Sequence, residues 1–382
     1  MSFKDLPIMP DKKKGVLLFY PYVSKKSAKN IKKKLSGRWL GQGPMVDKFE
    51  NNFKKKFAKN YSVVATGSGT DSLHLAYILA GLKSGDEVIT TIFTCTATNI
   101  PMLYMGLKIK FADIDRETMN ISVKSVKKLI TKKTKAIVCV HYGGLPCDMD
   151  ELKKISKKNK IALIEDAAHA LGAKYKNKPV GSLCDFSTFS FQAIKHFTTG
   201  DGGILTIRNK KLAEKAKRIR WFGIDRKKKQ QGIWKNDVHE IGYKYQMTDI
   251  AATMGCDSLN EFNHIHNHRK KIYNTYLTEL SQNKKVKCIH DNDKRKEHGA
   301  WLFTINVENK DYLQKKLREH FIETNQVHFR NDRYTIFKKY IKGKKFPNMD
   351  YLENRYLVLP LHHKVSVKDA KYISMLINKY AK

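Results

Sequence analysis

Two side chains near the middle of the chain have types and surroundings that suit amine chemistry. Asp166 ends the apolar run 161–166. Such a run is typical of a buried strand that carries a carboxylate to the edge of an open α/β sheet, where ligands bind. Lys195 lies between a segment rich in Phe, Ser and Thr and a glycine-rich turn. Because desolvation disfavours an ammonium, a lysine in apolar surroundings loses its proton more easily and can then form a Schiff base.

A Schiff-base lysine and an acid facing a pyridine nitrogen are the two protein groups that pyridoxal phosphate (PLP) chemistry requires. A plainer interpretation also fits the spacing of these two residues. Asp166 could simply end a strand, and Lys195 could be one of many solvated lysines. The spacing alone leaves both interpretations open.

The residues around this pair resemble the DegT/DnrJ/EryC1/StrS family of PLP-dependent aminotransferases, most of which act on nucleotide-linked keto sugars. The family pattern is EDAA(Q/H)ALGA, then GS..D, then FSF...K.LTTGEGG. The matching residues are Glu165-Asp166-Ala-Ala-His169-Ala-Leu-Gly-Ala, Gly181-Ser182 with Asp185, Phe189-Ser190-Phe191, Lys195 and Thr198-Thr-Gly-Asp-Gly-Gly203. The resemblance extends over nearly the whole chain.

This resemblance implies a role for each matching residue of the site. Lys195 would bind PLP as a Schiff base, and Asp166 would keep the pyridine nitrogen protonated. His169 occupies the place of a family Gln or His that lies near the phenolic oxygen of the cofactor. Ser190 matches a family serine that contacts the phosphate.

A strand, a glycine-rich turn and a helix between residues 61 and 82 form a further arrangement that could bind a phosphate. Free N–H groups and the helix dipole favour an anion at such a turn. Turns of this kind are also often no more than helix caps. The family has a phosphate-binding motif here, and the resemblance assigns Gly69, Thr70 and Ser68 to the PLP phosphate.

Two positions depart from the family pattern. Cys95 stands where an aromatic side chain commonly stacks on the PLP ring, so stacking could come weakly from its sulfur or from another residue. Lys244 stands where a family asparagine reaches the phosphate bound by the other subunit, and a lysine can also pair with phosphate. The resemblance thereby implies a homodimer with the active site at the interface.

Strand-length apolar runs alternate with helical patterns between residues 61 and 207, which favours a mainly parallel sheet covered by helices. The resemblance implies the type I PLP-transferase fold, of the aspartate aminotransferase kind, with a seven-stranded sheet. We expect a large α/β domain at 1–264, with an N-terminal arm over about 1–35, and a smaller α+β domain at 265–382. Residues 222–240 read as a mobile surface loop. Residues 39–44 read as a substrate-side loop or a plain helix entry.

The composition excludes several other classes of protein. The net charge of +38 comes from 62 lysines but only 12 arginines. Since proteins that read nucleic acid rely on arginine, we expect a lysine-rich surface and no nucleic-acid partner.

The chain has no apolar run of membrane-spanning length and no signal core, so we expect a cytoplasmic protein without a membrane partner. The six cysteines, without a CxxC pair, read as reduced core thiols. His264 and His268 lack a third ligand, so we expect no metal.

The resemblance predicts a transaminase that takes its amino group from L-glutamate. The sequence after Lys195 favours amination at C4 of a nucleotide-linked 4-keto-6-deoxyhexose, as in viosamine or perosamine synthesis for surface glycans such as O-antigen. A C3-specific aminotransferase and a PLP-binding regulatory or scaffold protein remain as alternatives. A PLP-dependent sugar dehydratase is disfavoured because such enzymes typically carry His at the position of Lys195.

Overall fold

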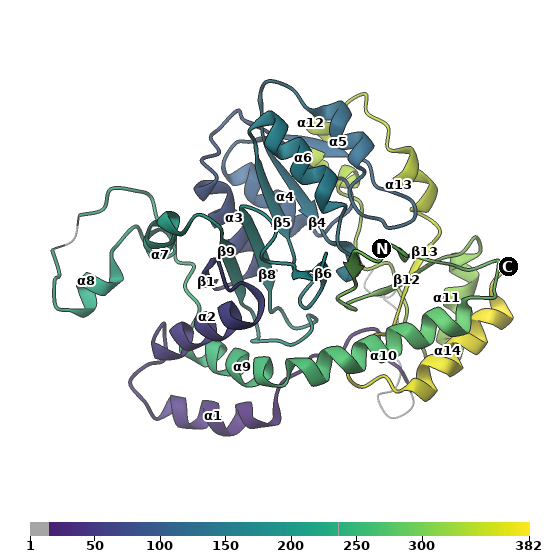
Figure 1. Ribbon diagram of the computed structural model, residues 1–382. Helices are drawn as coiled ribbons and strands as arrows, with labels where there is room; N and C mark the ends of the chain where they lie inside the picture. Colours follow the sequence, from purple (N-terminus) through teal and green to yellow (C-terminus); the bar gives the residue numbers. More distant parts are fainter. Residues whose placement is uncertain (1–14, 236) are drawn as a thin grey trace.

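The computed structural model describes residues 15–235 and 237–382. The first 14 residues of the predicted arm and large domain therefore lie outside the described residues. Figure 1 shows a central twisted sheet covered by helices, with a smaller sheet and a long helix beside it. The strands of the large sheet are β1 (Ser62–Thr66), β2 (Glu87–Thr91), β3 (Lys108–Ala112), β4 (Thr134–Val140), β5 (Ala162–Asp166), β8 (Phe186–Ser190) and β9 (Gly203–Ile207).

The large sheet is mainly parallel. Its strand order is β1-β9-β8-β5-β4-β2-β3, and β9 runs antiparallel to both of its neighbours while the other pairs are parallel. The chain returns between the parallel strands β2, β3, β4 and β5 through helices, as the alternating pattern predicted, whereas the described residues that connect β5 to β8 contain two short strands and no helix. The helices of this part are α1 (Lys25–Leu35), α2 (Pro44–Phe57), α3 (Gly69–Leu79), α4 (Thr96–Tyr104), α5 (Val123–Leu129), α6 (Met149–Asn159), α7 (Ala213–Ile219), α8 (Arg226–Gln230) and α9 (Asp249–Asn260).

Helices α2 and α3 cover opposite faces of this sheet. Along β1, Val63 and Ala65 belong to the core that contains the α2 residues Phe49 and Phe53, whereas Val64 belongs to the core that contains α3. Successive side chains of a strand point to opposite faces, so the alternation assigns each helix to one side. The apolar spacing along α2 matches one helical face, which explains why residues 44–57 bury their phenylalanines against the sheet.

The smaller sheet lies in the C-terminal part and is antiparallel. Its strands are β10 (Lys287–Cys288), β12 (Phe303–Asn306) and β13 (Tyr356–Leu359). A separate apolar core joins this sheet to helices that include α10 (Phe262–Leu280), α11 (Lys310–Glu319) and α14 (Val367–Tyr380). The other elements are α12 (Lys338–Ile341), α13 (Pro347–Leu352), a sheet of β6 (Lys174–Tyr175), β7 (Lys178–Pro179) and β11 (Lys296–Glu297), and the 3₁₀ turns η2 (Tyr142–Gly144), η3 (Lys210–Leu212), η4 (Asn331–Arg333) and η5 (Thr335–Phe337).

The predicted division at residues 264 and 265 falls inside the continuous helix α10. In addition, β11 from the C-terminal part pairs with β6 from the large part. The division into two domains stays a prediction. Within residues 15–235 and 237–382, no helix combines the length and apolar character needed to cross a membrane.

The segment 222–240 is not wholly loop, because it contains the short helix α8. Asp225 caps this helix by accepting hydrogen bonds from the N–H groups of Lys227 and Lys228, which explains a helical turn in such a polar stretch. Figure 1 shows α8 projecting from the body of the molecule next to α7.

Candidate active site

Asp166 is a buried carboxylate at the C-terminal end of β5. It is 5% exposed, and its Oδ2 accepts a hydrogen bond of 2.7 Å from the Thr98 hydroxyl at the first turn of α4. Its Oδ1 accepts from the backbone N–H of Ala168 at 3.1 Å. Burial raises the pKa of Asp166, while the two hydrogen bonds and the charge of Lys195 act in the opposite direction. A cationic partner at this position would therefore favour the ionised carboxylate.

The neighbouring acid, Glu165, lies on the other side of β5 and has a structural role. Its carboxylate accepts a hydrogen bond from the Ser187 hydroxyl on β8. His141 lies 3.2 Å away, with Nε2 facing Oε1 of Glu165. Because Nδ1 of His141 accepts the backbone N–H of Cys147 at 3.0 Å, the proton of a neutral ring sits on Nε2 and is donated to Glu165. Of the two acids, only Asp166 is directed to the predicted site.

The hydroxyl that holds Asp166 belongs to a network that the sequence analysis missed. The Thr94 and Thr98 hydroxyls lie 2.9 Å apart. The side-chain amide of Asn331 donates to the carbonyl oxygen of Thr94 at 2.7 Å and its oxygen accepts from Asn99 at 2.8 Å. Asn331 comes from the C-terminal part of the chain, so the carboxylate is supported by both parts of the molecule. Threonines in a helix start gave no sequence signal for this arrangement.

Lys195 follows β8 and enters the same region. Its Nζ lies 4.0 Å from the centre of the Trp301 ring. Although the residue retains some exposure, loss of solvation lowers the pKa of Lys195 to about 8, while Cys95 and Asp166 act to raise it. A lysine with a pKa of about 8 is a better nucleophile and base near neutral pH than a solvated lysine. Burial therefore prepares Lys195 for the chemistry that its sequence context predicted.

Three aromatic rings form a stack beside Lys195. The ring of His169 lies 3.9 Å from that of Trp301 and 5.0 Å from that of His328, with interplanar angles of 20° and 8°. Burial lowers the pKa of His169 well below its usual value and that of His328 to about 3, so both imidazoles are neutral. Sequence analysis found His169 but not Trp301 or His328, because a Trp in a strand-like run and an isolated His give no signal of their own.

Two buried ring nitrogens in this stack have no partner among the described residues: Nδ1 of His169 and Nε2 of His328. Buried polar groups are almost always hydrogen-bonded. A polar ligand beside Lys195 and Asp166 would supply what these atoms lack.

The predicted phosphate residues lie together at the N-terminus of α3. Ser68 is the N-cap, and its hydroxyl accepts from the N–H of Asp71 at 3.0 Å. Gly69 and Thr70 are in the first turn, where backbone N–H groups lack helical acceptors. A Cβ on Gly69 would lie 2.9 Å from Cβ of Ser190, the last residue of β8. Only glycine permits this close approach, which places Ser190 at the helix terminus and forms a cradle suited to a phosphate.

Cys95, the predicted stacking position, is not a core thiol. It is the N-cap of α4 and is exposed, and its charge would act to raise the pKa of Lys195 and of Tyr334. The prediction of core thiols holds for Cys139, Cys147, Cys184 and Cys256 but is wrong for Cys95 and only partly correct for Cys288, which is half-buried.

Lys244 is not brought into contact with these residues within one chain. Its Nζ lies 5.2 Å from the centre of the Phe222 ring. With the amide of Gln246 turned so that its oxygen faces the lysine, the two side chains form a hydrogen bond of 2.9 Å. The assignment of Lys244 to a phosphate stays a prediction.

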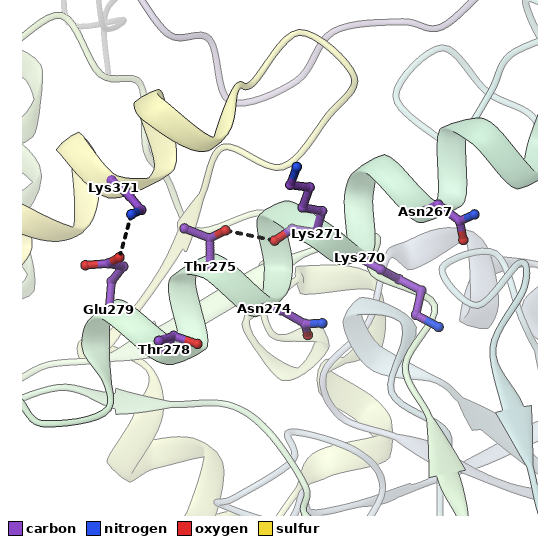
Figure 2. A pocket seen from close by; sticks show the side chains of 8 residues that line it. All are labelled: Asn267, Lys270, Lys271, Asn274, Thr275, Thr278, Glu279 and Lys371. Carbon is purple, nitrogen blue, oxygen red and sulfur yellow. Dashed lines mark hydrogen bonds and ion pairs between the residues drawn. The ribbon is translucent and has the colours of Figure 1, made fainter.

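The hollows in the described part of the chain that lie outside this cluster include these two. One, of about 840 Å³, runs between residues 38–47 and 214–234 and contains Trp39, Trp221 and Trp234. The other, of about 580 Å³, lies over α10 and α14 and contains no residue of the predicted site (Figure 2). Across the described parts of the chain, no group of three or more His, Cys, Asp or Glu is arranged to hold a metal, and Nε2 of His268 faces the carbonyl oxygen of Val365 at 2.9 Å.

Comparison with known proteins identifies the class to which this fold and cluster belong. The sequence profile of the DegT/DnrJ/EryC1/StrS aminotransferase family matches residues 21–378, and the chain belongs to that family. The predicted fold is confirmed as the type I PLP-transferase fold, and the protein is an aminotransferase whose cofactor is PLP.

The relatives include sugar aminotransferases. The chain is 32% identical to GDP-perosamine synthase of Escherichia coli O157:H7, over 96% of this chain and 99% of that protein. It is 34% identical to UDP-4-amino-4,6-dideoxy-N-acetyl-beta-L-altrosamine transaminase of Campylobacter jejuni, over 90% and 91%. The crystal structure of AtS13 from Actinomadura melliaura superimposes with a TM-score of 0.91 at 29% identity, covering 97% of this chain and all of that one.

The residues present are suited to PLP. The cluster offers a lysine with a lowered pKa, a buried carboxylate, two imidazole nitrogens without partners and a glycine cradle at a helix N-terminus. These are the groups that an aldehyde, a pyridine nitrogen, a phenolic oxygen and a phosphate require.

Proposed function

We propose that this protein transfers an amino group from L-glutamate to C4 of a nucleotide-linked 4-keto-6-deoxyhexose, in the synthesis of an amino sugar for a surface glycan. The observation that carries this proposal is the cluster of Lys195, Asp166 and the α3 N-terminus in a chain of the sugar aminotransferase family. GDP-perosamine synthase, a relative of full-length coverage, supports the perosamine-like sugar.

Lys195 and Asp166 would hold the cofactor and carry the proton transfers. PLP, when bound, supplies an electron sink that allows a C–H bond next to an amine to break. The Lys195 Nζ would attach to the cofactor and, once free, would move a proton between the cofactor and the substrate carbon. The Asp166 carboxylate would accept a hydrogen bond from the protonated ring nitrogen. Thr98 and the N–H of Ala168 would keep that carboxylate in place.

The remaining residues would bind and orient. Ser68, Gly69, Thr70 and Ser190 would bind the phosphate, because the first turn of a helix supplies free N–H groups and a favourable dipole. His169 would donate or accept a hydrogen bond at the phenolic oxygen through the nitrogen that lacks a partner. Cys95, exposed beside Lys195, would contact the cofactor in place of the family aromatic residue.

The absorbance spectrum of the PLP-loaded protein tests the proposal. Addition of L-glutamate should shift the absorbance from the lysine-bound to the amine form of the cofactor, and a nucleotide-linked 4-keto-6-deoxyhexose should return it. Nuclear magnetic resonance of the product then assigns the amino group to C4 or C3. A Lys195→Arg variant is the control and should show neither change. A spectrum indifferent to every amino donor would favour the non-catalytic alternative.

We also propose that the protein is a homodimer in which Lys244 of one subunit serves the phosphate site of the other. The Nζ of Lys244 faces the ring of Phe222, and the carbonyl oxygen of the next residue, Tyr245, accepts the N–H of Gly67 beside the α3 N-terminus. Phe222, Trp234 and Ile241 in that region are exposed. Exposed apolar groups of this kind mark protein interfaces.

Hybrid dimers test this arrangement. Each proposed site combines Lys195 of one subunit with Lys244 of the other, so Lys195→Ala and Lys244→Ala each damage a different half of it. A hybrid dimer of the two variants would contain one intact site. Refolding them together should therefore restore up to about a quarter of the wild-type sites. Sedimentation measures the dimer in each sample. A mixture that contains hybrid dimers but regains no activity would contradict the shared site.

A further inference from the structure

Trp301 holds the backbone next to Lys195 as well as its amine. Its indole N–H donates a hydrogen bond of 2.9 Å to the carbonyl oxygen of Ile194, the residue before Lys195. Its ring centre lies 4.0 Å from Nζ of Lys195. Trp301 is fully buried, and its ring also stacks against His169 and, at 6.0 Å between ring centres, against Phe19. These contacts leave the indole little freedom to move away from Lys195.

The indole face acts on the charge of the amine. The titratable groups that influence Lys195, or are influenced by it, are Cys95, Asp166, His169, His196 and His328. Burial lowers the pKa of each of these three imidazoles, so they carry no counter-charge. Cys95 and Asp166 are then the groups that favour an ammonium, and an aromatic face within about 6 Å of the nitrogen adds a further attraction.

We propose that Trp301 is a positioning residue that holds the free amine of Lys195 over its indole face whenever the lysine is not bonded to the cofactor. This inference rests on the proposed function, because an aminotransferase must keep its lysine close to the reacting carbon while the lysine is free. The contact limits how far the amine can withdraw, and it favours the protonated form from which the lysine returns a proton.

Two replacements separate the aromatic face from the indole N–H. Trp301→Phe retains an aromatic face and loses the hydrogen bond to Ile194. Trp301→Leu loses both. Loss of a cation–π contact corresponds to a fall of about half a unit to one and a half units in the pKa of Lys195. We therefore expect a clear fall in Trp301→Leu and a smaller one in Trp301→Phe.

Competitive labelling of the cofactor-free protein measures this pKa without any turnover. Trace acetic anhydride is applied across a pH series, and the acetylated fraction of the Lys195 peptide is read by mass spectrometry against surface lysines of the same sample. Phe19→Leu is the matched control, because it removes a stacking partner of Trp301 but keeps the indole, and it should leave the pKa of Lys195 unchanged. Circular dichroism and thermal unfolding confirm that each variant is folded.

Equal labelling profiles for wild type and a folded Trp301→Leu would overturn the inference. So would a shift of the same size in Phe19→Leu, since general loosening of the core would then explain it. If Trp301→Leu does not fold, Trp301→Phe and Trp301→Tyr provide the comparison. Labelling profiles identical to wild type in both variants, together with an unchanged kcat, would then overturn the inference. If instead the labelling shift is found but L-glutamate leaves the spectrum of the loaded wild type unchanged, the proposed function fails while the contact between Trp301 and Lys195 stands.

Discussion

The Lys195 cluster and the hollow over α10 and α14 contain the same kinds of side chain in different surroundings. In the hollow, Lys371 approaches Glu279 at 3.7 Å and the Thr275 hydroxyl donates to the carbonyl oxygen of Lys271 at 2.9 Å (Figure 2). Around Lys195 there are again a lysine, a carboxylate and threonine hydroxyls, but they are enclosed by Trp301 and two neutral imidazoles. Ion pairs open to water contribute little, whereas burial changes the pKa of each partner. Water access, more than residue type, separates the candidate catalytic Lys195 from the exposed Lys371 of the hollow.

The largest effect is expected from Lys195→Arg. An arginine keeps the positive charge but cannot lose its proton or bond to the cofactor, so turnover should fall by at least about 10³-fold. The measurement is the rate of amination of a nucleotide-linked keto sugar by the PLP-loaded protein. Lys371→Arg in the hollow is the matched control and should retain full activity. Comparable losses of turnover in both variants would show that the two regions do not differ in their importance for activity.

A smaller loss is expected from Asp166→Asn. The amide has nearly the same shape but no charge, so turnover should fall by about 10²-fold. The stability of the cofactor-free protein should change in the opposite direction. A raised carboxyl pKa means that the folded state binds the proton more tightly than the unfolded chain, so this stabilisation is present at low pH and is lost as the pH rises through the folded-state pKa.

The variant should therefore unfold at a higher urea concentration than wild type at pH 7, and the difference should vanish as the pH falls below the ordinary carboxyl pKa of about 4. Glu279→Gln in the hollow is the control and should change neither quantity. An Asp166→Asn protein that is less stable than wild type at pH 7 would show that the charge is well solvated, contrary to the burial of this side chain.

Thr98→Val should reduce activity less than Asp166→Asn does. Valine keeps the volume and removes the hydroxyl that donates to Asp166. Hydrogen bonds to charged groups are worth about 1.5–3 kcal/mol, so activity should fall roughly tenfold and the pKa of Asp166 should rise. The pH dependence of the bound-cofactor spectrum reports the second change. Thr278→Val, in the hollow, is the control; if it costs as much activity as Thr98→Val, the network around Asp166 has no special role.

The smallest effect is expected from Lys371→Ala. Its partner Glu279 is solvent-accessible, so loss of the pair should change the free energy of unfolding by less than about 0.5 kcal/mol. Urea unfolding with and without 0.5 M salt measures the change. A loss that is large and insensitive to salt would indicate that the hollow is a tighter site than its ion pair suggests.

The sequence was a good guide where chemistry depends on local order. Asp166 lies at the end of a strand and Gly69 and Thr70 open a helix after a strand, as their apolar and glycine patterns predicted. The alternating strands and helices also predicted the mainly parallel sheet. These features arise from short-range rules, because strand burial, helix capping and glycine turns are written within a few neighbouring residues.

The sequence was a poor guide where a residue acts through contacts from distant segments. Trp301 and His328 are more than 100 residues from Lys195 along the chain, yet they form the walls beside it. Asn331 reaches back to Thr94 and Asn99 to fix the turn that holds Asp166. Cys95 was read with the other cysteines as a core thiol as well as a possible stacking partner of the cofactor, but it lies at the N-cap position of α4 and is exposed.

The sequence by itself determined the family and the fold class, and it predicted the two residues that would carry the chemistry of an aminotransferase. Only the tertiary structure decided which lysine loses solvent, which imidazoles are left without partners and which indole lies over the amine. The physical reason is that desolvation depends on every segment that packs around a group, and in this protein those segments come from both parts of the chain.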